Sequence, residues 1–430
     1  MDNKKKKSGI QIFFDCAQLV IALFIPLAII AYTVMQNNTE ISIAQENRKQ
    51  DLKIADERHE QEIILSTDEQ EEAALVRYFD SLGKLLEKDM KLMNRTSIAR
   101  FKTLTALAQL KSKRKGYLIR ALIENKLITM NYGEDLIIDL SLADLTGLDL
   151  STNMLVKKEI TCANFNQTTL INASFRGVTL TGITFAQSIL INSDFSLSSA
   201  NMYSCGDSTS FRTNFMDTIL DNSTFDGAKH IKSSFDKSSL NHVRMRRFKC
   251  TDCIFTKAKM YSADLSDATF QSELGSRSRF YYQKMRIFST LLYRAKFFNI
   301  NFAQTELTMV NATMATFNNC DFSVTVFKNN SFIQTTIYNS PFFRASLKQS
   351  SWYKAKISYT SFFETDMTDI NFIDSECHYC HFNQTLLKGA NFTNSSLDGS
   401  DFSQANITYQ ELIVARSLQN VILPNGTIFQ

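Results

Sequence analysis

A large apolar residue recurs at every fifth position over most of this chain, from Leu145 towards the C-terminus. One stretch contains Phe165, Leu170, Phe175, Leu180, Phe185, Leu190 and Phe195, and a later one contains Phe317, Phe322, Phe327, Phe332, Ile337 and Phe342. A helix with about 3.6 residues per turn would spread these side chains around its whole surface, so the period excludes a helix. Fixed self-similarity at a short period is typical of a solenoid, in which each repeat packs on its neighbours.

Each repeat also has a small residue two positions before the large one, often followed by Asp or Asn. Examples are Ala143-Asp144-Leu145, Ala163-Asn164-Phe165 and Ala390-Asn391-Phe392. In an extended chain, residues two apart share one face, so the small and large residues point inward and the Asp or Asn faces water. The other two residues are mostly polar and must turn a corner, because the period is five and not two. The pattern therefore predicts an all-β solenoid.

These repeats resemble the pentapeptide-repeat family, whose consensus is Ala-(Asp/Asn)-Leu-x-x, and in particular its members with an N-terminal membrane anchor and a helical stalk. The resemblance implies a right-handed quadrilateral β-helix with four pentapeptides in each coil. We expect a first solenoid part over 141–270 and a second over 292–407. Between them, 271–291 is an irregular segment in which the phase of the repeat changes by two.

The N-terminal region differs in composition from the repeats. A basic tail over 1–9 contains four consecutive lysines, and the chain is then almost entirely apolar to Val34, with Pro26 inside. About 20 apolar residues span a bilayer as a helix, so we expect a transmembrane helix over 10–35. A signal peptide is the alternative, but its apolar region would be shorter and would lead to a small-residue cleavage site. The pattern favours an uncleaved anchor.

The charges beside the apolar segment predict its orientation. The first basic residues after it are Arg48 and Lys49, well past its end, whereas the lysines precede it directly. Because basic residues close to a span are retained in the cytoplasm, we expect a cytoplasmic N-terminus and an exoplasmic or lumenal repeat domain. Several Asn-x-Ser/Thr sequons, such as those at Asn391 and Asn406, give little support for this orientation. A repeat rich in Asn, Ser and Thr contains such sequons by chance.

Residues 36–93 predict a helical stalk with two interpretations. The first half is almost entirely polar and is typical of a solvated spacer helix. Over 72–93, an apolar stripe favours a coiled coil that would join copies of the chain as a homo-oligomer. The stripe consists of Leu75, Phe79, Leu82 and Leu86.

Both ends of the solenoid need a lid, because an open end exposes core and strand edges. After a break at Asn94 to Ser97, residues 97–130 predict a helical N-terminal cap. Its basic run over 111–115 favours a solvated helix connection over contact with acidic lipid or nucleic acid. A C-terminal cap is expected over 408–430, where Thr408 and Glu411 have capping-box spacing.

Two interruptions break the period, and one of them is the candidate partner site. The repeat fails between Asn201 and Thr213, which predicts a loop. In the irregular segment, basic and aromatic residues occur together, as at sites that bind nucleic acids or anions. The alternative is a bulged coil without a special role. The candidate residues are Arg277, Arg279, Tyr281, Tyr282, Lys284 and Arg286.

Cysteines and histidines show no metal or catalytic pattern. Two Cys-x-x-Cys pairs could build a zinc site only if they met, and they are several coils apart. All four thiols are expected to point into the core, as small apolar groups or as disulfides, while His378 and His381 point outward. His230 occupies an inward slot and is expected to be a buried core residue. The pairs are Cys250 with Cys253 and Cys377 with Cys380.

Taken together, these features predict a protein without catalysis, cofactor or metal. No Gly-rich phosphate loop, zinc-protease or serine-hydrolase motif is present, and the net charge of +4 is ordinary. The favoured function is a single-pass membrane scaffold that presents a rigid rod to an unidentified protein. The alternative is a nucleic-acid mimic that binds a DNA-handling enzyme such as a topoisomerase. Basic residues slightly outnumber acidic ones after Ser141, which disfavours mimicry, and binding of nucleic acid itself is also disfavoured.

Overall fold

The structure is a computed structural model that describes residues 9–87, 92–129, 137–151, 159–200, 203–204, 210–211, 213–272 and 285–429. The chain divides into two compact units, Met1–Glu72 and Ala73–Gln430. Each unit is described separately below.

The first unit consists of most of one long helix, α1 (Gly9–Leu86), which continues past Glu72 into the second unit. An 18-residue window of α1 has a mean hydropathy of 1.9 and is 0% buried, so the helix is long and apolar enough to span a membrane. A signal sequence near the N-terminus would meet the same criterion. Pro26 lies inside the helix. The expected transmembrane helix over 10–35 and the expected stalk as far as Leu86 are thus one helix, whereas the last residues of the expected stalk, from Leu92, belong to the next helix.

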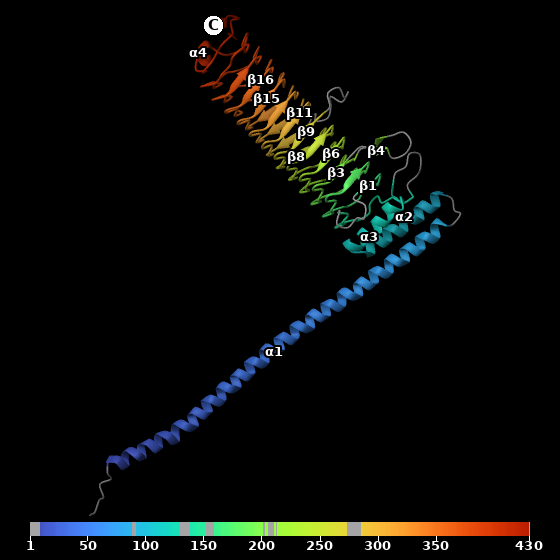
Figure 1. The fold of residues 1–430 in the computed structure, drawn as a ribbon, viewed down its shortest axis with the longest axis vertical. Helices are drawn as coiled ribbons and strands as arrows, with labels where there is room; N and C mark the ends of the chain where they lie inside the picture. Colours follow the sequence, from blue (N-terminus) through green and yellow to red (C-terminus); the bar gives the residue numbers. More distant parts are fainter. Residues whose placement is uncertain are drawn as a thin grey trace, which may run out of the picture. The chain divides into compact units, whose positions relative to one another are not determined.

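Three helical segments lie at the N-terminal end of the solenoid: the end of α1, α2 (Leu92–Gln109) and α3 (Ser112–Glu124) (Figure 1). The predicted break at Asn94 to Ser97 is wrong, because α2 begins before it. Asn, Ser and Thr are tolerated in a first helical turn, where their side chains can satisfy free backbone groups. Arg100 and Lys115 hold these helices to the first coil by donating to the carbonyl oxygens of Ser141 and Asp144, at 2.6 and 2.9 Å.

The end of α1 packs on α2 within the same chain. The Tyr78 and Thr103 hydroxyls are 2.8 Å apart, and burial raises the pKa of Tyr78 to about 12. Leu82 is 3% exposed and belongs to the core, whereas Phe79 is 36% exposed. The predicted self-association through Leu82 therefore needs correction, because its side chain already has an intramolecular partner. The predicted stripe therefore has one residue in the core, Leu82, and another at the surface, Phe79.

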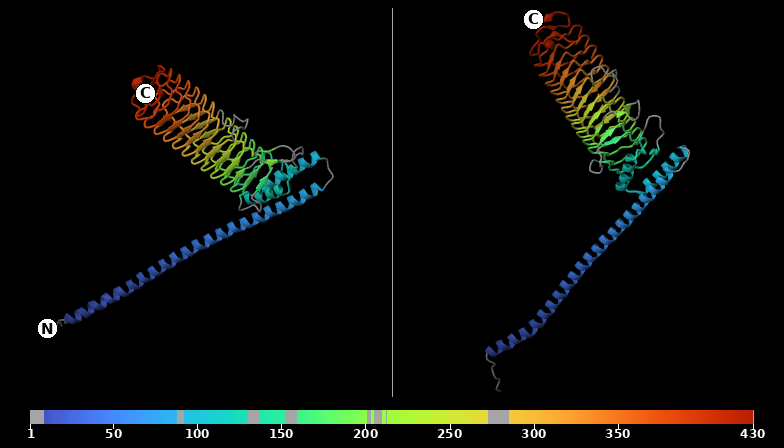
Figure 2. Two further views of the ribbon diagram at one scale, coloured as in Figure 1. Left: turned by 45° about the horizontal axis from the view of Figure 1, so that its top comes forward. Right: turned by 45° about the vertical axis from the view of Figure 1, so that its right-hand side comes forward.

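The repeats form a parallel β-solenoid whose coils stack along one axis (Figures 1 and 2). Its eleven-stranded sheet has the order β1-β2-β3-β6-β7-β9-β11-β13-β15-β16-β17. Glu159 is in register with Thr179, and Lys229 with Lys249. An uninterrupted coil therefore has twenty residues, or four pentapeptides. A second sheet, β14-β12-β10-β8, has four strands on another side.

The strands are short because each pentapeptide contains only one short extended segment before the chain turns the next corner. The strands of the long sheet are β1 (Glu159–Thr161), β2 (Thr179–Thr181), β3 (Ser199–Ala200), β6 (Lys229–Ile231), β7 (Lys249–Thr251), β9 (Thr269–Gln271), β11 (Lys296–Phe298), β13 (Thr316–Asn318), β15 (Thr336–Tyr338), β16 (Lys356–Ser358) and β17 (Glu376–His378). Those of the second sheet are β8 (Lys259–Tyr261), β10 (Arg286–Phe288), β12 (Glu306–Thr308) and β14 (Val326–Lys328).

The chain turns each corner through a residue in the left-handed region, two positions after the inward residue. Asn192, Asn222 and Asn319 have φ values of 57°, 60° and 56°. Asn and Asp adopt this conformation more readily than most L-residues, because their short side chains can bond to the backbone locally. The corner repeats at every fifth residue, as the sequence pattern requires.

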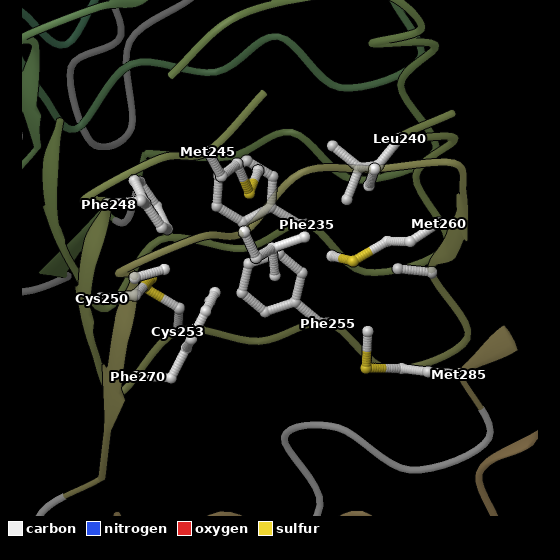
Figure 3. Packing of buried hydrophobic residues seen from close by; sticks show 14 of the residues in the cluster. Phe235, Leu240, Met245, Phe248, Cys250, Cys253, Phe255, Met260, Phe270 and Met285 are labelled. Atoms are coloured by element: carbon white, nitrogen blue, oxygen red, sulfur yellow. A yellow bond between two sulfur atoms is a disulfide. The ribbon is translucent and has the colours of Figure 1, made fainter. Parts of the chain in front are cut away.

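The expected inward residues form a continuous core. Phe165, Phe185 and Phe215 stack in one column, with centroid distances of 5.5 and 5.1 Å between consecutive rings, and all three are 0% exposed. Farther along, Phe235 and Phe255 continue the column beside the sulfur-containing side chains in Figure 3. The burial of all four Cys-x-x-Cys thiols is confirmed, and each pair forms a disulfide. The pairs are Cys250–Cys253 and Cys377–Cys380.

Two interruptions follow strands of the long sheet. After β3, the antiparallel hairpin of β4 (Tyr203–Ser204) and β5 (Ser210–Phe211) lies where the sequence predicts a loop. After β9, residues 273–284 lie outside the described residues, and the chain re-enters the solenoid as β10. At the C-terminal end, Thr408 and Glu411 form the capping box of α4 (Tyr409–Leu412). A hairpin of β18 (Val421–Ile422) and β19 (Ile428–Phe429) follows.

Candidate interaction surface

The site predicted at the phase shift can be assessed only at its last residue. Arg277, Arg279, Tyr281, Tyr282 and Lys284 lie outside the described residues. Arg286 begins β10, where it is in register with Lys259 and Glu306. Its side chain is exposed, with Nε 4.0 Å from the Glu306 carboxylate. The described residues therefore place one member of this group on the surface, already beside an acidic partner.

His230 is a satisfied core residue, as its slot predicts. Its Nε2 lies 3.2 Å from the Ser198 hydroxyl and its Nδ1 lies 3.1 Å from the Ser233 hydroxyl. Complete burial lowers the pKa of His230 to about 3, because the charged imidazolium would lose its hydration. The imidazole is therefore neutral at physiological pH and lies away from any solvent-accessible substrate.

Among the residues that the structure describes, no group of three or more His, Cys, Asp or Glu side chains is arranged to hold a metal ion. His378 and His381 are at the surface, as expected, while the neighbouring cysteines are paired inside.

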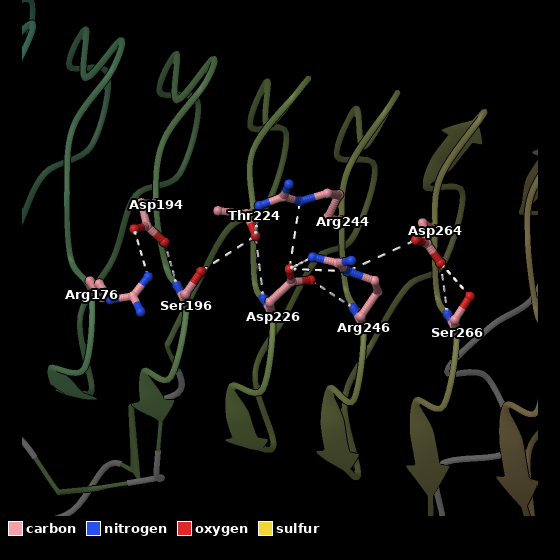
Figure 4. Close-up of polar contacts among 9 residues, drawn as sticks. All are labelled: Arg176, Asp194, Ser196, Thr224, Asp226, Arg244, Arg246, Asp264 and Ser266. Carbon is pink, nitrogen blue, oxygen red and sulfur yellow. Dashed lines mark hydrogen bonds and ion pairs between the residues drawn. The ribbon is translucent and has the colours of Figure 1, made fainter.

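The outer side chains form columns, because residues one coil apart lie on neighbouring strands. Figure 4 shows a column on one side of the solenoid in which charges neutralise one another. Arg246 donates to the Asp226 carboxylate at 2.6 Å, and Arg244 lies 3.6 Å from it. Burial alone would raise the pKa of Asp226, but the hydrogen bonds from Arg246 and the two positive charges lower it. This side offers little net charge to a partner.

A groove of about 640 Å³ near the C-terminal end contains polar side chains that pair with one another. Lys356 lies 3.9 Å from the Glu376 carboxylate, and Asn394 donates to Asp374 at 2.6 Å. Its wall therefore has few polar groups that require a partner. The lining residues include Met314, Gln334, Thr336, Lys354 and Arg416.

One surface of the long sheet is different, and we call it the basic face. It consists of Lys229 on β6, Lys249 on β7, Lys296 on β11, and Arg247 at the corner before β7. Lys229 is in register with Lys249, and Thr269 separates Lys249 from Lys296. All four basic side chains are exposed. Within the described part of the chain, none of them forms an ion pair with a carboxylate.

The sequence analysis missed this surface, although a signal was present. Between Lys229 and Lys259 there are nine basic residues and only two acidic residues, Asp236 and Asp252. Asp252 is 2% exposed and accepts a hydrogen bond from Ser272, so it contributes little to the outer surface. The irregular segment breaks the period, whereas these basic residues keep the period and stand out only when charges one coil apart are compared.

Comparisons with known proteins agree with the fold. Residues 160–196, 233–271 and 370–408 match the profile of the family described as pentapeptide repeats, in eight copies. No curated protein compared with the chain is a significant match.

Among solved structures, the chain is similar to HetL, a pentapeptide repeat protein involved in heterocyst differentiation regulation from the cyanobacterium Nostoc sp. Strain PCC 7120. The identity is 16%, over 64% of this chain and 94% of HetL, with a TM-score of 0.18. It is also similar to full-length QnrB1, a plasmid-mediated fluoroquinolone resistance protein, at 15% identity over 46% of this chain and 94% of QnrB1, with a TM-score of 0.24.

A pentapeptide repeat protein from the Arabidopsis thaliana thylakoid lumen is 16% identical over 30% of this chain and 81% of its own length, with a TM-score of 0.16. The family match falls on coils whose inward slots, corners and twenty-residue register are described above. The chain is a member of the pentapeptide-repeat family.

Proposed function

We propose that this chain is a non-enzymatic membrane scaffold that presents its solenoid to partner proteins. The observation that supports the proposal most directly is the eleven-stranded sheet, whose parallel register gives the outer side chains a fixed spacing along the rod. A continuous core of stacked aromatic rings makes such a surface rigid, so binding a partner costs little ordering of the rod. The apolar helix α1 supplies the anchor in this proposal.

Photo-crosslinking in the native membrane tests the scaffold role. A photoreactive residue would replace Ile231, Tyr359 or Leu386, which are 43%, 53% and 47% exposed. The matched control replaces Leu387, which is 0% exposed. The proposal expects a discrete crosslinked protein from at least one exposed position and none from the control. An absence of crosslinks at all three exposed positions would contradict it.

The orientation follows from the charges around the apolar segment. We propose a cytoplasmic N-terminus and an exoplasmic or lumenal solenoid, because the four consecutive lysines precede the segment and the next basic residue is Arg48. Carbonate extraction should leave the protein in the membrane fraction, and protease should reach the repeats only from the exoplasmic or lumenal side. Digestion after permeabilising only the plasma membrane, without a glycosidase shift, would place the rod in the cytosol instead.

The nucleic-acid mimic gains no support from the described surface. A mimic of duplex DNA needs columns of acidic side chains, whereas Lys229 is in register with Lys249 on the long sheet. A pull-down that captures a topoisomerase with the solubilised protein would nevertheless favour the mimic over the scaffold.

A further inference from the structure

The basic face places like charges on neighbouring strands. Lys229 and Lys249 occupy the same register position on β6 and β7, and adjacent strands are about 4.8 Å apart. Like charges directly opposite each other destabilise a sheet. The free rod would therefore be more stable with a different residue at one of these positions.

At other places the same solenoid sets a carboxylate beside a basic residue, although Lys259 and Arg286 are a second pair of like charges in register. In the long sheet itself, Lys356 on β16 has Glu376 on β17 as its register neighbour, 3.9 Å away. At another corner, Arg344 donates to the Glu364 carboxylate at 2.6 Å. Carboxylates one coil away from a basic residue are thus compatible with this fold. Among the described residues, no carboxylate lies beside Lys249. This absence results from the amino-acid sequence and not from the geometry of the backbone.

We propose that the basic face binds an acidic segment of a partner protein. This proposal rests on the scaffold function above and names the surface and the chemistry of the partner. Carboxylates of the partner would lie over Lys229, Lys249 and Lys296 and replace the missing negative charges of the rod. Arg247, at the corner before β7, extends the positive surface to one side.

The surroundings favour a polypeptide over a nucleic acid or a lipid surface. Ile231 is 43% exposed and shares β6 with Lys229, while half-buried Phe298 shares β11 with Lys296. Apolar side chains beside the column of lysines can pack on side chains of a peptide, whereas a phosphodiester backbone offers them nothing comparable.

The extent of the face agrees with this choice. From β6 to β11 there are three steps between strands, or about 14 Å, which four or five residues of extended peptide would cover. A nucleic-acid site commonly neutralises about six to ten phosphates over a wider area. The arginines of the column in Figure 4 already have acidic partners, so they do not widen the positive surface.

The test uses the full chain in detergent micelles and a fluorescein-labelled octaglutamate peptide, with binding followed by fluorescence anisotropy at low and at physiological ionic strength. The test variant combines Lys229→Gln, Lys249→Gln and Lys296→Gln. The control combines Lys257→Gln, Lys259→Gln and Lys388→Gln, which removes the same charge from exposed lysines elsewhere on the solenoid. We expect the control to bind like the natural protein and the test variant to bind about tenfold more weakly, since each exposed ion pair contributes up to about 1 kcal/mol.

A single charge reversal, Lys249→Glu, provides a second measurement. It should place a carboxylate beside Lys229, as Glu376 lies beside Lys356, so the thermal midpoint should rise while peptide binding falls. A variant that loses binding and remains folded separates recognition from folding.

Three results would overturn the proposal: no binding by the natural protein, an equal loss in the control, or tighter binding to phosphatidylserine vesicles or a duplex oligonucleotide that the test variant abolishes. If crosslinks from the rod persist while the peptide fails to bind, the scaffold function stands and only the basic face is refuted.

Discussion

Lowering the pH should destabilise the solenoid through one buried histidine. His230 is 1% exposed, and its pKa falls from 6.5 to about 3 because burial removes the hydration of the imidazolium. Below pH 6.5, the unfolded chain binds a proton at this residue and the folded chain does not. The free energy of unfolding therefore decreases as the pH falls through this range, and the decrease ends near pH 3.

The size of the effect follows from the two pKa values. Each pH unit between them corresponds to about 1.4 kcal/mol. At pH 4.5, the proton bound by the unfolded state lowers the free energy of unfolding by about 2.7 kcal/mol relative to pH 7.5. The Ser198 and Ser233 hydroxyls lie within hydrogen-bond distance of the two ring nitrogens, so the neutral ring is satisfied in the folded state.

Urea denaturation of the detergent-solubilised full chain, followed by far-ultraviolet circular dichroism, measures this effect. The natural protein is compared with His230→Leu at both pH values. Leucine leaves two serine hydroxyls without their partner, which costs about 1–3 kcal/mol, but that cost is the same at each pH and cancels in the comparison. Carboxylates that titrate in both proteins cancel in the same way.

The control is His242→Asn, because His242 is exposed at a corner with φ of 55°, a conformation that Asn tolerates. We expect the natural protein and this control to lose about 2.7 kcal/mol more than His230→Leu between pH 7.5 and 4.5. Equal losses in all three proteins would refute the assignment of His230 as a buried neutral group.

Two further predictions concern the core. Phe327 is 1% exposed, and its ring centroid lies 5.6–5.8 Å from those of Phe322, Phe332 and Phe342. Phe327→Ala should therefore lower the free energy of unfolding by about 3–5 kcal/mol, and Phe327→Asp by more; an unchanged urea midpoint would disprove its inward position. Trp352 is 0% exposed, and its indole N–H has no hydrogen-bond partner among the described residues. Trp352→Phe should change stability by less than about 1.5 kcal/mol, because the lost ring volume is offset by removing an unsatisfied donor, whereas a loss as large as that of Phe327→Ala would show that the indole is satisfied in solution.

The solenoid was predictable because its determinants are local and repeated. Phe165 and Phe185 each occupy an inward slot that five neighbouring residues define, and the structure confirms both as buried and stacked. The helical region was harder. Leu82 fits a stripe for self-association, but the same apolar face can pack on another copy or on the next helix, and periodicity cannot distinguish the two. In the structure the next helix is the partner, as the contact between the Tyr78 and Thr103 hydroxyls shows.

Because of the two interruptions, the sequence alone does not predict every pair of neighbouring residues on the surface of the solenoid. Where coils are regular, a residue lies beside the residue twenty positions later, as Lys229 lies beside Lys249. Across the hairpin after β3, the register partner of Ser199 is thirty positions later, and across the segment after β9, Lys296 follows Thr269 by twenty-seven. The phase shift reveals the second interruption but not which strands remain neighbours across it. Only the observed register places Lys296 on the same sheet surface as Lys249.

The same register explains why a regular repeat can carry a specific surface. The core constrains two residues of each pentapeptide, so the outward positions can vary with little effect on folding. Lys356 lies beside Glu376, and this pair of opposite charges stabilises the rod. Lys249 lies beside Lys229, and this pair of like charges destabilises it. Because the backbone is the same at both places, we attribute the difference to the proposed partner outside the rod. The charge reversal at Lys249 tests this reasoning directly: if the reversed protein is no more stable than the natural one, the lysines are too well solvated to repel, and their stacking is no sign of a partner.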